Sequence, residues 1–332
     1  MRYVDEFRDP KKAQTLTEEI KRLVPRIPAS RRRPLQVMEV CGGHTHTIFR
    51  YGIQQMLPDE VEYVHGPGCP VCVLPMGRVD DCVALAERPE VIFTTFGDAM
   101  RVPGSRTSLL KAKAEGADVR MVYSPLDALA IARQHPNREV IFFGLGFGTT
   151  MPSTAMTLTQ ARRQGLGNFS LFCNHITIIP TIKAILDSPD LQLDGFVGPG
   201  HVSMVIGTRP YEFIARDYAR PVTIAGFAVE EVFELRPFFE WRGLGSIDHS
   251  GVRIRDAYAA FDAERKFGVP NVTVADPQAC QCGEVLKGQI KPQQCRVFGT
   301  ACTPETPLGA LMVSSKGACA AYHSYGRYPV HA

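Results

Sequence analysis

The chain has 332 residues, and its 45% hydrophobic and 21% charged content is typical of a folded protein with two or three domains. Its 37 basic and 34 acidic residues leave a formal charge of +3, which gives no reason to expect nucleic acid or a membrane surface as a partner. No apolar run approaches the roughly 20 residues of a membrane helix, and the charged start lacks the apolar core of a secretory signal.

These exclusions predict a cytoplasmic location, where thiols are kept reduced. The ten cysteines of the chain are therefore poor candidates for structural disulfides. Metal binding and redox chemistry become the leading explanations for them.

Residues 1–30 are predicted to form an N-terminal helical segment, with a helix over Thr15–Leu23 that ends before Pro25. Beyond it, short apolar runs alternate with amphipathic helical patterns, which predicts parallel α/β units. The predicted strands are Leu35–Val40, Glu62–His65, Val91–Phe96, Val119–Tyr123, Val140–Phe147, Ser170–Cys173, Gly195–Val197 and Val222–Ala225.

These eight strands divide into two sets of four on either side of His135, so we predict two similar parallel-sheet α/β lobes, 31–134 and 135–228. Several strands run directly into glycine-containing loops, and sites in open parallel sheets form at the carboxyl ends of strands. One such loop, Gly144–Thr150, lacks the spacing of a dinucleotide fingerprint and the lysine of a P-loop. We interpret it as a tight turn that leads into a cleft.

Cys41 stands where the first predicted strand gives way to a helix, and it is followed by two glycines, His44 and His46. The glycines allow a tight turn and the close approach of another molecule. A cysteine at a helix N-terminus with imidazoles nearby should have a lowered pKa and be present partly as the thiolate that ligates metal. The alternative is a small core residue beside capping histidines.

Cys69 and Cys72 form a Cys-x-x-Cys pair in the rigid loop Gly66–Cys72. Such a pair can ligate a metal jointly or cycle between dithiol and disulfide. Other candidate side chains lie in or after strands. Cys82 and Cys173 are interpreted as core residues, and His175 and His201 as residues that could line the cleft.

Residues 229–332 are predicted to form a small irregular C-terminal domain, because five cysteines, with several prolines and glycines, fall between Asp276 and Cys319 with little periodicity. A segment that buries little apolar surface needs another source of stability, such as a metal centre. The cysteines are Cys280, Cys282, Cys295, Cys302 and Cys319. They lack the paired Cys-x-x-Cys knuckles of zinc sites, which favours an iron–sulfur cluster over structural zinc or free thiols.

Six motifs occur along the chain in a specific order: Cys41-Gly-Gly-His-Thr-His, Gly66-Pro-Gly-Cys-Pro-Val-Cys, Gly146-Phe-Gly-Thr-Thr, Gly198-Pro-Gly-His-Val-Ser, Glu240-Trp-Arg-Gly-Leu-Gly, and Cys302-Thr-Pro with Gly317-Ala-Cys. Together they resemble the HypD family of [NiFe]-hydrogenase maturation factors over nearly the whole chain. The resemblance implies an assembly scaffold, with possible redox activity, rather than a metabolic enzyme. With the small chaperone HypC, such proteins hold iron while the Fe(CN)2CO group is assembled, and HypE delivers the cyanide.

The resemblance also assigns residues. It implies that Cys41 is the thiolate shared with HypC for iron, that Cys69 and Cys72 are cleft thiols, and that His44 is a close helper. It implies a [4Fe-4S] cluster, with ligands Cys280, Cys295, Cys302 and Cys319.

The chain departs from the family pattern at several positions. Gly148 and Lys316 stand where the family usually has glutamate, Leu311 where some members have a cysteine that pairs with Cys282, and the stretch around Val232 is shortened. Two rival functions remain: a thiol–disulfide oxidoreductase that uses Cys69 and Cys72, and a zinc-stabilised interaction module.

Overall fold

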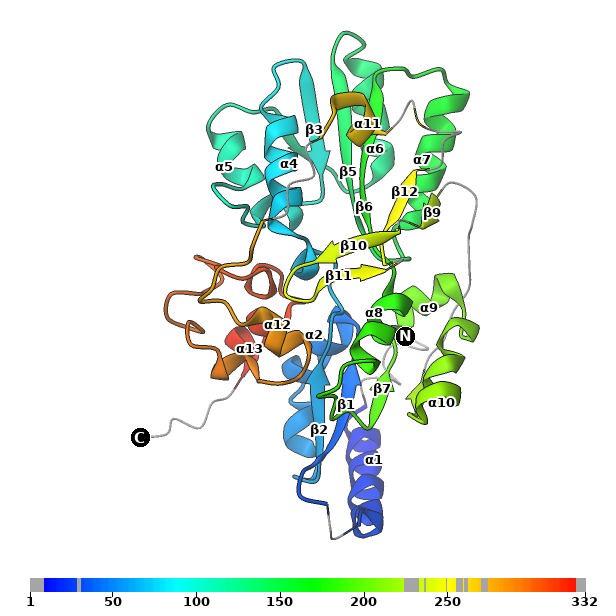
Figure 1. The fold of residues 1–332 in the computed structure, drawn as a ribbon, viewed down its shortest axis with the longest axis vertical. Helices are drawn as coiled ribbons and strands as arrows, with labels where there is room; N and C mark the ends of the chain where they lie inside the picture. Colours follow the sequence, from blue (N-terminus) through cyan, green and yellow to red (C-terminus); the bar gives the residue numbers. More distant parts are fainter. Residues whose placement is uncertain are drawn as a thin grey trace.

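The computed structural model describes residues 9–28, 31–223, 233–235, 237–248, 250–254, 259, 262–269 and 274–326. Two four-stranded parallel sheets, each with its own helices, form an upper and a lower lobe, and the C-terminal segment lies against both (Figure 1). Among the described residues, no helix has the length and apolar character needed to cross a membrane.

The lower lobe contains the sheet with strand order β2-β1-β7-β8, and all of its neighbouring strands are parallel. Its central strand β1 pairs Val37 with Tyr63 on one side and with Gly195 on the other. The strands are β1 (Leu35–Glu39), β2 (Val61–His65), β7 (Gly195–Val197) and β8 (Val222–Thr223). The helices of this lobe are α1 (Pro10–Leu23), α2 (Gly42–Arg50), α3 (Ile53–Met56), α8 (Ile178–Leu186), α9 (Gly200–Ile206) and α10 (Glu212–Tyr218).

The upper lobe contains the sheet with strand order β4-β3-β5-β6, again parallel throughout. All five residues of β3 are buried, which is the pattern of a parallel strand covered by helices on both faces. The strands are β3 (Val91–Thr95), β4 (Val119–Met121), β5 (Glu139–Gly146) and β6 (Phe169–His175). The helices are α4 (Met76–Ala86), α5 (Leu109–Ala114), α6 (Pro125–Gln134) and α7 (Met151–Arg163).

Taken in chain order, the strands of both sheets follow the same arrangement, second-first-third-fourth. The predicted pair of similar parallel α/β lobes is therefore confirmed, but the predicted boundary between residues 134 and 135 is wrong. β1 and β2 pair with β7 and β8, so the upper lobe is inserted into the lower one. The chain passes between the lobes through residues 66–75 and again after His175, and the first of these connections carries Cys69 and Cys72.

The C-terminal segment begins with antiparallel strands that the sequence did not predict. β9 (Phe233–Leu235) pairs with β12 (Val252–Ile254), and β10 (Phe238–Trp241) pairs with β11 (Gly245–Asp248). After α11 (Ala263–Phe267), the described chain from Ala275 onward is mostly loops and short turns, as predicted. Its helices are α12 (Cys282–Leu286) and α13 (Ala318–Tyr325). Short 3-10 turns are η2 (Val24–Arg26), η3 (Val71–Val73), η4 (Ala99–Arg101), η5 (Arg209–Tyr211), η7 (Pro292–Gln294) and η8 (Ala310–Met312).

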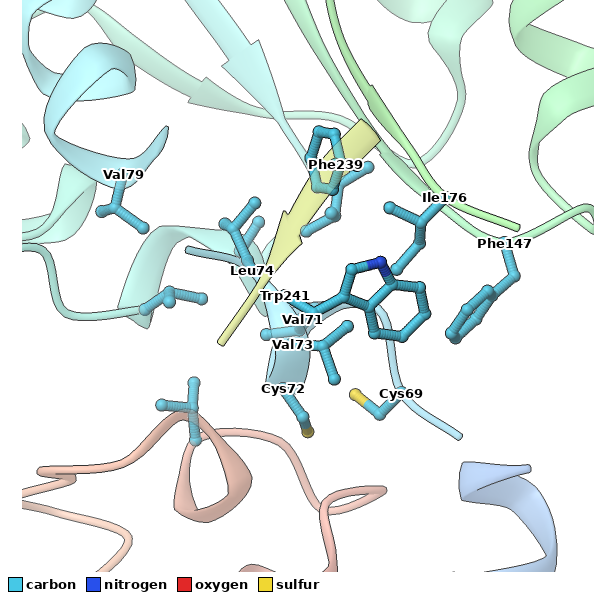
Figure 2. Packing of buried hydrophobic residues seen from close by; sticks show 14 of the residues in the cluster. Cys69, Val71, Cys72, Val73, Leu74, Val79, Phe147, Ile176, Phe239 and Trp241 are labelled. Carbon is cyan, nitrogen blue, oxygen red and sulfur yellow. The ribbon is translucent and has the colours of Figure 1, made fainter. Parts of the chain in front are cut away.

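The hairpin β10–β11 crosses the molecule between the two lobes and places Trp241 in the core (Figures 1 and 2). Trp241 is 1% exposed, and its indole N–H donates to the Ser250 hydroxyl at 2.8 Å. Its ring centroid lies 5.9 Å from that of Phe147, which follows β5. Cys69 and Cys72 belong to the same cluster and lie below Trp241 in the view of Figure 2. The hairpin thus ties the connection between the lobes to the rest of the core.

Candidate functional site

A cavity of about 500 Å³ lies between the lobes, where loops from both sheets meet. The loops after β1 and β7 line it from the lower lobe, and those after β3 and β5 line it from the upper lobe. The connection after β2, which carries Cys69, and Lys316 of the C-terminal segment complete the lining. β1 and β7 are neighbours in the lower sheet, and β3 and β5 are neighbours in the upper sheet. In each pair the connections to the next strands leave in opposite directions, and parallel sheets form ligand sites at such positions. The lining residues include Cys41, Gly43, Cys69, Phe96, Asp98, Phe147, Thr149, Thr150, His201 and Lys316. The glycine loops therefore meet at one cleft, as expected.

Cys41 is the residue that caps the N-terminus of α2, directly beyond β1. Only 8% of Cys41 is exposed, and the residue lines the cleft. Burial raises the pKa of the Cys41 thiol, although the backbone N–H groups of Gly43 and His44 act in the opposite direction. The predicted lowering of this pKa is thus wrong, because the effect of desolvation outweighs that of the helix N-terminus.

Glu39, which the sequence reasoning missed, holds the Cys41 loop in place through hydrogen bonds. Its side chain is completely buried and accepts from the Cys41 backbone N–H at 3.0 Å, from the Thr45 hydroxyl, and from His65 Nδ1 at 2.8 Å. A buried carboxylate is retained only where such partners satisfy it. These bonds connect the ends of β1 and β2 to the first turn of α2, so they fix the backbone that carries Cys41. The signal in the sequence was a single acidic residue inside the apolar run Leu35–Val40.

Gly68 brings the dithiol loop against the Cys41 loop. The Gly42 backbone N–H donates to the Gly68 carbonyl at 3.0 Å. A Cβ atom at position 68 would lie 2.5 Å from the Gly42 nitrogen and 2.6 Å from the Cys41 Cα. Only a glycine allows this approach, which explains why the loop carries one here.

Cys69 and Cys72 have different surroundings. Cys69 lines the cleft, and its pKa is lowered by hydrogen bonds from the Cys72 side chain and backbone and from Ser314. Cys72 is fully buried, and burial raises its pKa well above the ordinary value. Its sulfur lies on the side of the C-terminal segment, 2.9 Å from where a Cβ of Gly317 would stand. The structure therefore places Cys69 in the cleft and Cys72 behind it.

The histidines proposed for the cleft, His175 and His201, and the proposed helper His44 have separate positions. His201 lines it: a Cβ built on Gly43 would lie 3.8 Å from His201 Cε1 and 3.7 Å from the Cys41 sulfur. His44 lies outside the lining residues, and burial lowers its pKa.

His175 is fully buried, so the expectation that it lines the cleft is wrong. Its Nε2 lies 3.0 Å from the Thr154 hydroxyl, and its Nδ1 lies 3.3 Å from the Thr150 hydroxyl. Burial lowers its pKa to about 4. His175 therefore lies behind Thr150, which is part of the cleft wall, and supports it. The other two thiols considered, Cys82 and Cys173, are core residues as predicted.

Four of the five C-terminal cysteines are electrostatic neighbours. Besides burial, the charges of Cys280, Cys302 and Cys295 raise the pKa of Cys319. The fifth cysteine, Cys282, is buried beside Cys280, and a hydrogen bond from its side chain lowers the pKa of Cys280 to about 7. Among the described residues, no three His, Cys, Asp or Glu side chains are arranged to hold a single metal ion.

Backbone groups approach these sulfur atoms closely. The Leu308 N–H donates to Cys302 Sγ at 3.3 Å, and a Cβ on Gly309 would lie 2.5 Å from Cys280 Sγ. Cys319 feels the charges of the other three cysteines that the resemblance names, and Cys282 is hydrogen-bonded to Cys280.

The departures from the family pattern fall partly in the cleft. Lys316 lines it, and its charge acts to lower the pKa of Cys41. Gly148 faces α9, where a Cβ would lie 3.3 Å from Ile206 and 3.5 Å from Val202. Leu311 is buried. The shortened stretch around Val232 lies outside the described residues.

Comparison with known proteins gives a consistent result. A family model for HypD, described as "Hydrogenase formation hypA family", matches residues 11–232 and 228–326. The hydrogenase maturation factor HypD of Rhodobacter capsulatus is 55% identical over 371 aligned positions, which cover 98% of each chain. HypD of Escherichia coli K12 is 50% identical, again over 98% of each chain.

The same comparisons bear on the shortened stretch. The alignment with the Rhodobacter capsulatus protein has 371 positions, whereas this chain has 332 residues, so the relative contains residues that this chain lacks. The two segments matched by the family model meet at residues 228–232, where the sequence indicated a missing segment.

Proposed function

The chain belongs to the HypD family of hydrogenase maturation factors, and we propose that it is a [NiFe]-hydrogenase maturation scaffold that holds iron in the cleft while the Fe(CN)2CO group is assembled. One observation carries this proposal: the side chains of Cys41 and Cys69 line a single cavity at the carboxyl ends of both sheets. Thiolates are soft ligands that suit iron bearing cyanide and carbon monoxide.

In this proposal Cys41 and Cys69 are the iron ligands that the chain presents. Cys72 stands behind Cys69, and the two side chains are hydrogen-bonded. The small chaperone HypC would bring a further ligand to Cys41, and HypE would deliver cyanide to the same opening. His44 is proposed as a helper, because it lies in the first turn of α2 next to the Cys41 loop.

The C-terminal thiols fit a [4Fe-4S] cluster held by Cys280, Cys295, Cys302 and Cys319. Four cysteines that sense one another's charge, together with a backbone N–H directed at one sulfur, are the donor set that such clusters use. A bound cluster would supply single electrons. The chain's own contribution is to keep the thiols together and to place Cys72 next to Gly317, two residues before Cys319.

The test is Cys41→Ala, examined for maturation of a hydrogenase in cells and for the cluster in anaerobically purified protein. We expect maturation to be lost and iron with acid-labile sulfide to be retained, since Cys41 is in the cleft and not among the C-terminal thiols. Cys282→Ser is a matched control outside both proposed ligand sets, and it should retain maturation. Full maturation by Cys41→Ala would contradict the assignment.

The asymmetry of Cys69 and Cys72 favours one second candidate, a thiol–disulfide oxidoreductase. A thiol with a lowered pKa that faces a cavity, next to a buried partner with a raised pKa, is the arrangement that such enzymes use. If Cys69→Ser alone abolishes reduction of a generic disulfide substrate by the purified protein, this candidate gains support. Zinc in place of iron and sulfide in the purified protein would favour a zinc-stabilised interaction module instead.

A further inference from the structure

The motif from Glu240 to Gly245 has no role in the function proposed above, although it lies between the two sulfur sites. It forms the end of β10 and the turn of the hairpin β10–β11. Trp241 packs in the same cluster as Cys69 and Cys72 (Figure 2). The side chain of the next residue, Arg242, contacts Asp276 and Leu308 farther along the C-terminal segment and Pro103 of the upper lobe.

Arg242 is a buried cation with several partners. Its side chain is 1% exposed, and Nε donates to Asp276 Oδ1 at 2.8 Å. The guanidinium also donates to the carbonyl groups of Pro103 and Leu308, at 3.4 and 3.5 Å. The Arg242 backbone N–H donates to the Val73 carbonyl at 2.9 Å, directly after the dithiol. The charge is thus held at one place by contacts on several sides.

These contacts place the charge next to the C-terminal thiols. Leu308, whose carbonyl accepts from Arg242, donates its own N–H to Cys302 Sγ at 3.3 Å. The neighbour of Arg242, Gly243, is so close to Cys282 that a Cβ there would lie 3.2 Å from its sulfur.

We propose that Arg242 is a positioning residue that raises the reduction potential of the iron–sulfur cluster held by Cys280, Cys295, Cys302 and Cys319. The inference rests on the proposed function, because it requires that cluster. A reduced cluster carries one more negative charge than the oxidised form, and a fixed buried cation stabilises it. Asp276 is 28% exposed and carries the opposite charge, so it offsets part of the effect of Arg242.

Removing the two charges, one at a time, should shift the midpoint potential of the cluster in opposite directions. The cluster's midpoint potential is measured by anaerobic redox titration of the full chain, followed by electron paramagnetic resonance. Arg242→Gln should lower the potential, by about a tenfold change in the reduction equilibrium, or about 59 mV for one electron. Asp276→Asn should raise it, because the guanidinium then acts unopposed. Arg296→Gln is a matched control, since this cation follows Cys295 but is exposed to solvent, and its removal should change the potential much less.

Asp276→Asn also keeps the test valid if Arg242→Gln does not fold, because Arg242 then retains its carbonyl acceptors. Shifts in the same direction for both variants, or no shift in either, would overturn the role of Arg242 and leave the proposed function standing. A wild-type protein with no cluster signal after reduction would overturn the proposed function and this inference together.

Discussion

Replacing Gly68 with alanine tests whether the contact between the Cys41 loop and the dithiol loop holds the cleft together. The added Cβ would lie 2.5 to 2.6 Å from backbone atoms of Gly42 and Cys41, and backbone atoms cannot rotate away as a flexible side chain can. Overpacking of this kind costs about 1 to 3 kcal/mol. Losing the hydrogen bond from Gly42 to the Gly68 carbonyl adds roughly 1 kcal/mol. We therefore expect Gly68→Ala to lower the free energy of unfolding by about 2 to 4 kcal/mol.

The chain offers a matched control in a second Gly-Pro-Gly sequence. Gly200 is the third residue of that tripeptide, as Gly68 is of the first, but a Cβ at position 200 would meet nothing within 4 Å. Gly200→Ala should change stability by less than about 1 kcal/mol. Chemical denaturation measures both values, and iron bound per chain reports on the cleft, where Gly68→Ala should bind less. Equal stability and equal iron in the two variants would refute the close approach as the reason for the glycine.

Three further changes test other parts of the structure. Glu39→Gln should lower the free energy of unfolding by about 1 to 3 kcal/mol and reduce iron binding, because the three donors around the buried carboxylate lose one acceptor oxygen. Unchanged stability and unchanged iron binding would contradict this. Trp241→Ala should cost about 3 to 5 kcal/mol in chemical denaturation, since the ring is almost wholly buried, and a loss below 1 kcal/mol would show that the core is loosely packed there. The pKa of His175 is about 4 in the folded chain and 6.5 ordinarily, so the unfolded chain binds more protons between these values. Stability should therefore fall as the pH drops from 6.5 to 4, by up to about 3 kcal/mol, and His175→Gln should lack this component.

Much of the fold could be predicted because its strands are short apolar runs separated by helical patterns. All eight predicted strands are present, and most of their ends differ from the prediction by only a few residues; for example, Val140–Phe147 was predicted and β5 is Glu139–Gly146. The partition into lobes could not be predicted in the same way. Pairing of β1 with β7 joins residues far apart in the chain, and periodicity records only which face of a strand is buried. The hairpin β10–β11 was missed because its strands lack a continuous apolar run: Glu240 interrupts the first, and Ile247 is the only large apolar residue of the second.

The candidate site was predictable where it consists of cysteines, and unpredictable where it depends on tertiary contacts. Cys41 and Cys69 are in the cleft because turns with glycine and proline follow their strands, and those turns are visible in the sequence. The pKa of Cys41 depends on how deeply the folded chain buries it, which no motif records. Glu39 and Arg242 are isolated charged residues in apolar or mixed segments, and only the fold shows which partners satisfy them.

The proposed function requires that the cleft thiols hold iron that carries cyanide and carbon monoxide. Infrared spectroscopy of the protein purified without air, together with its HypC-type partner from cells that make hydrogenase, tests it most directly. We expect stretching bands of bound cyanide and carbon monoxide in the wild type and none in Cys41→Ala, with the C-terminal cluster present in both. Wild-type protein that contains the cluster and the partner but shows no such bands, or bands that persist in Cys41→Ala, would contradict it.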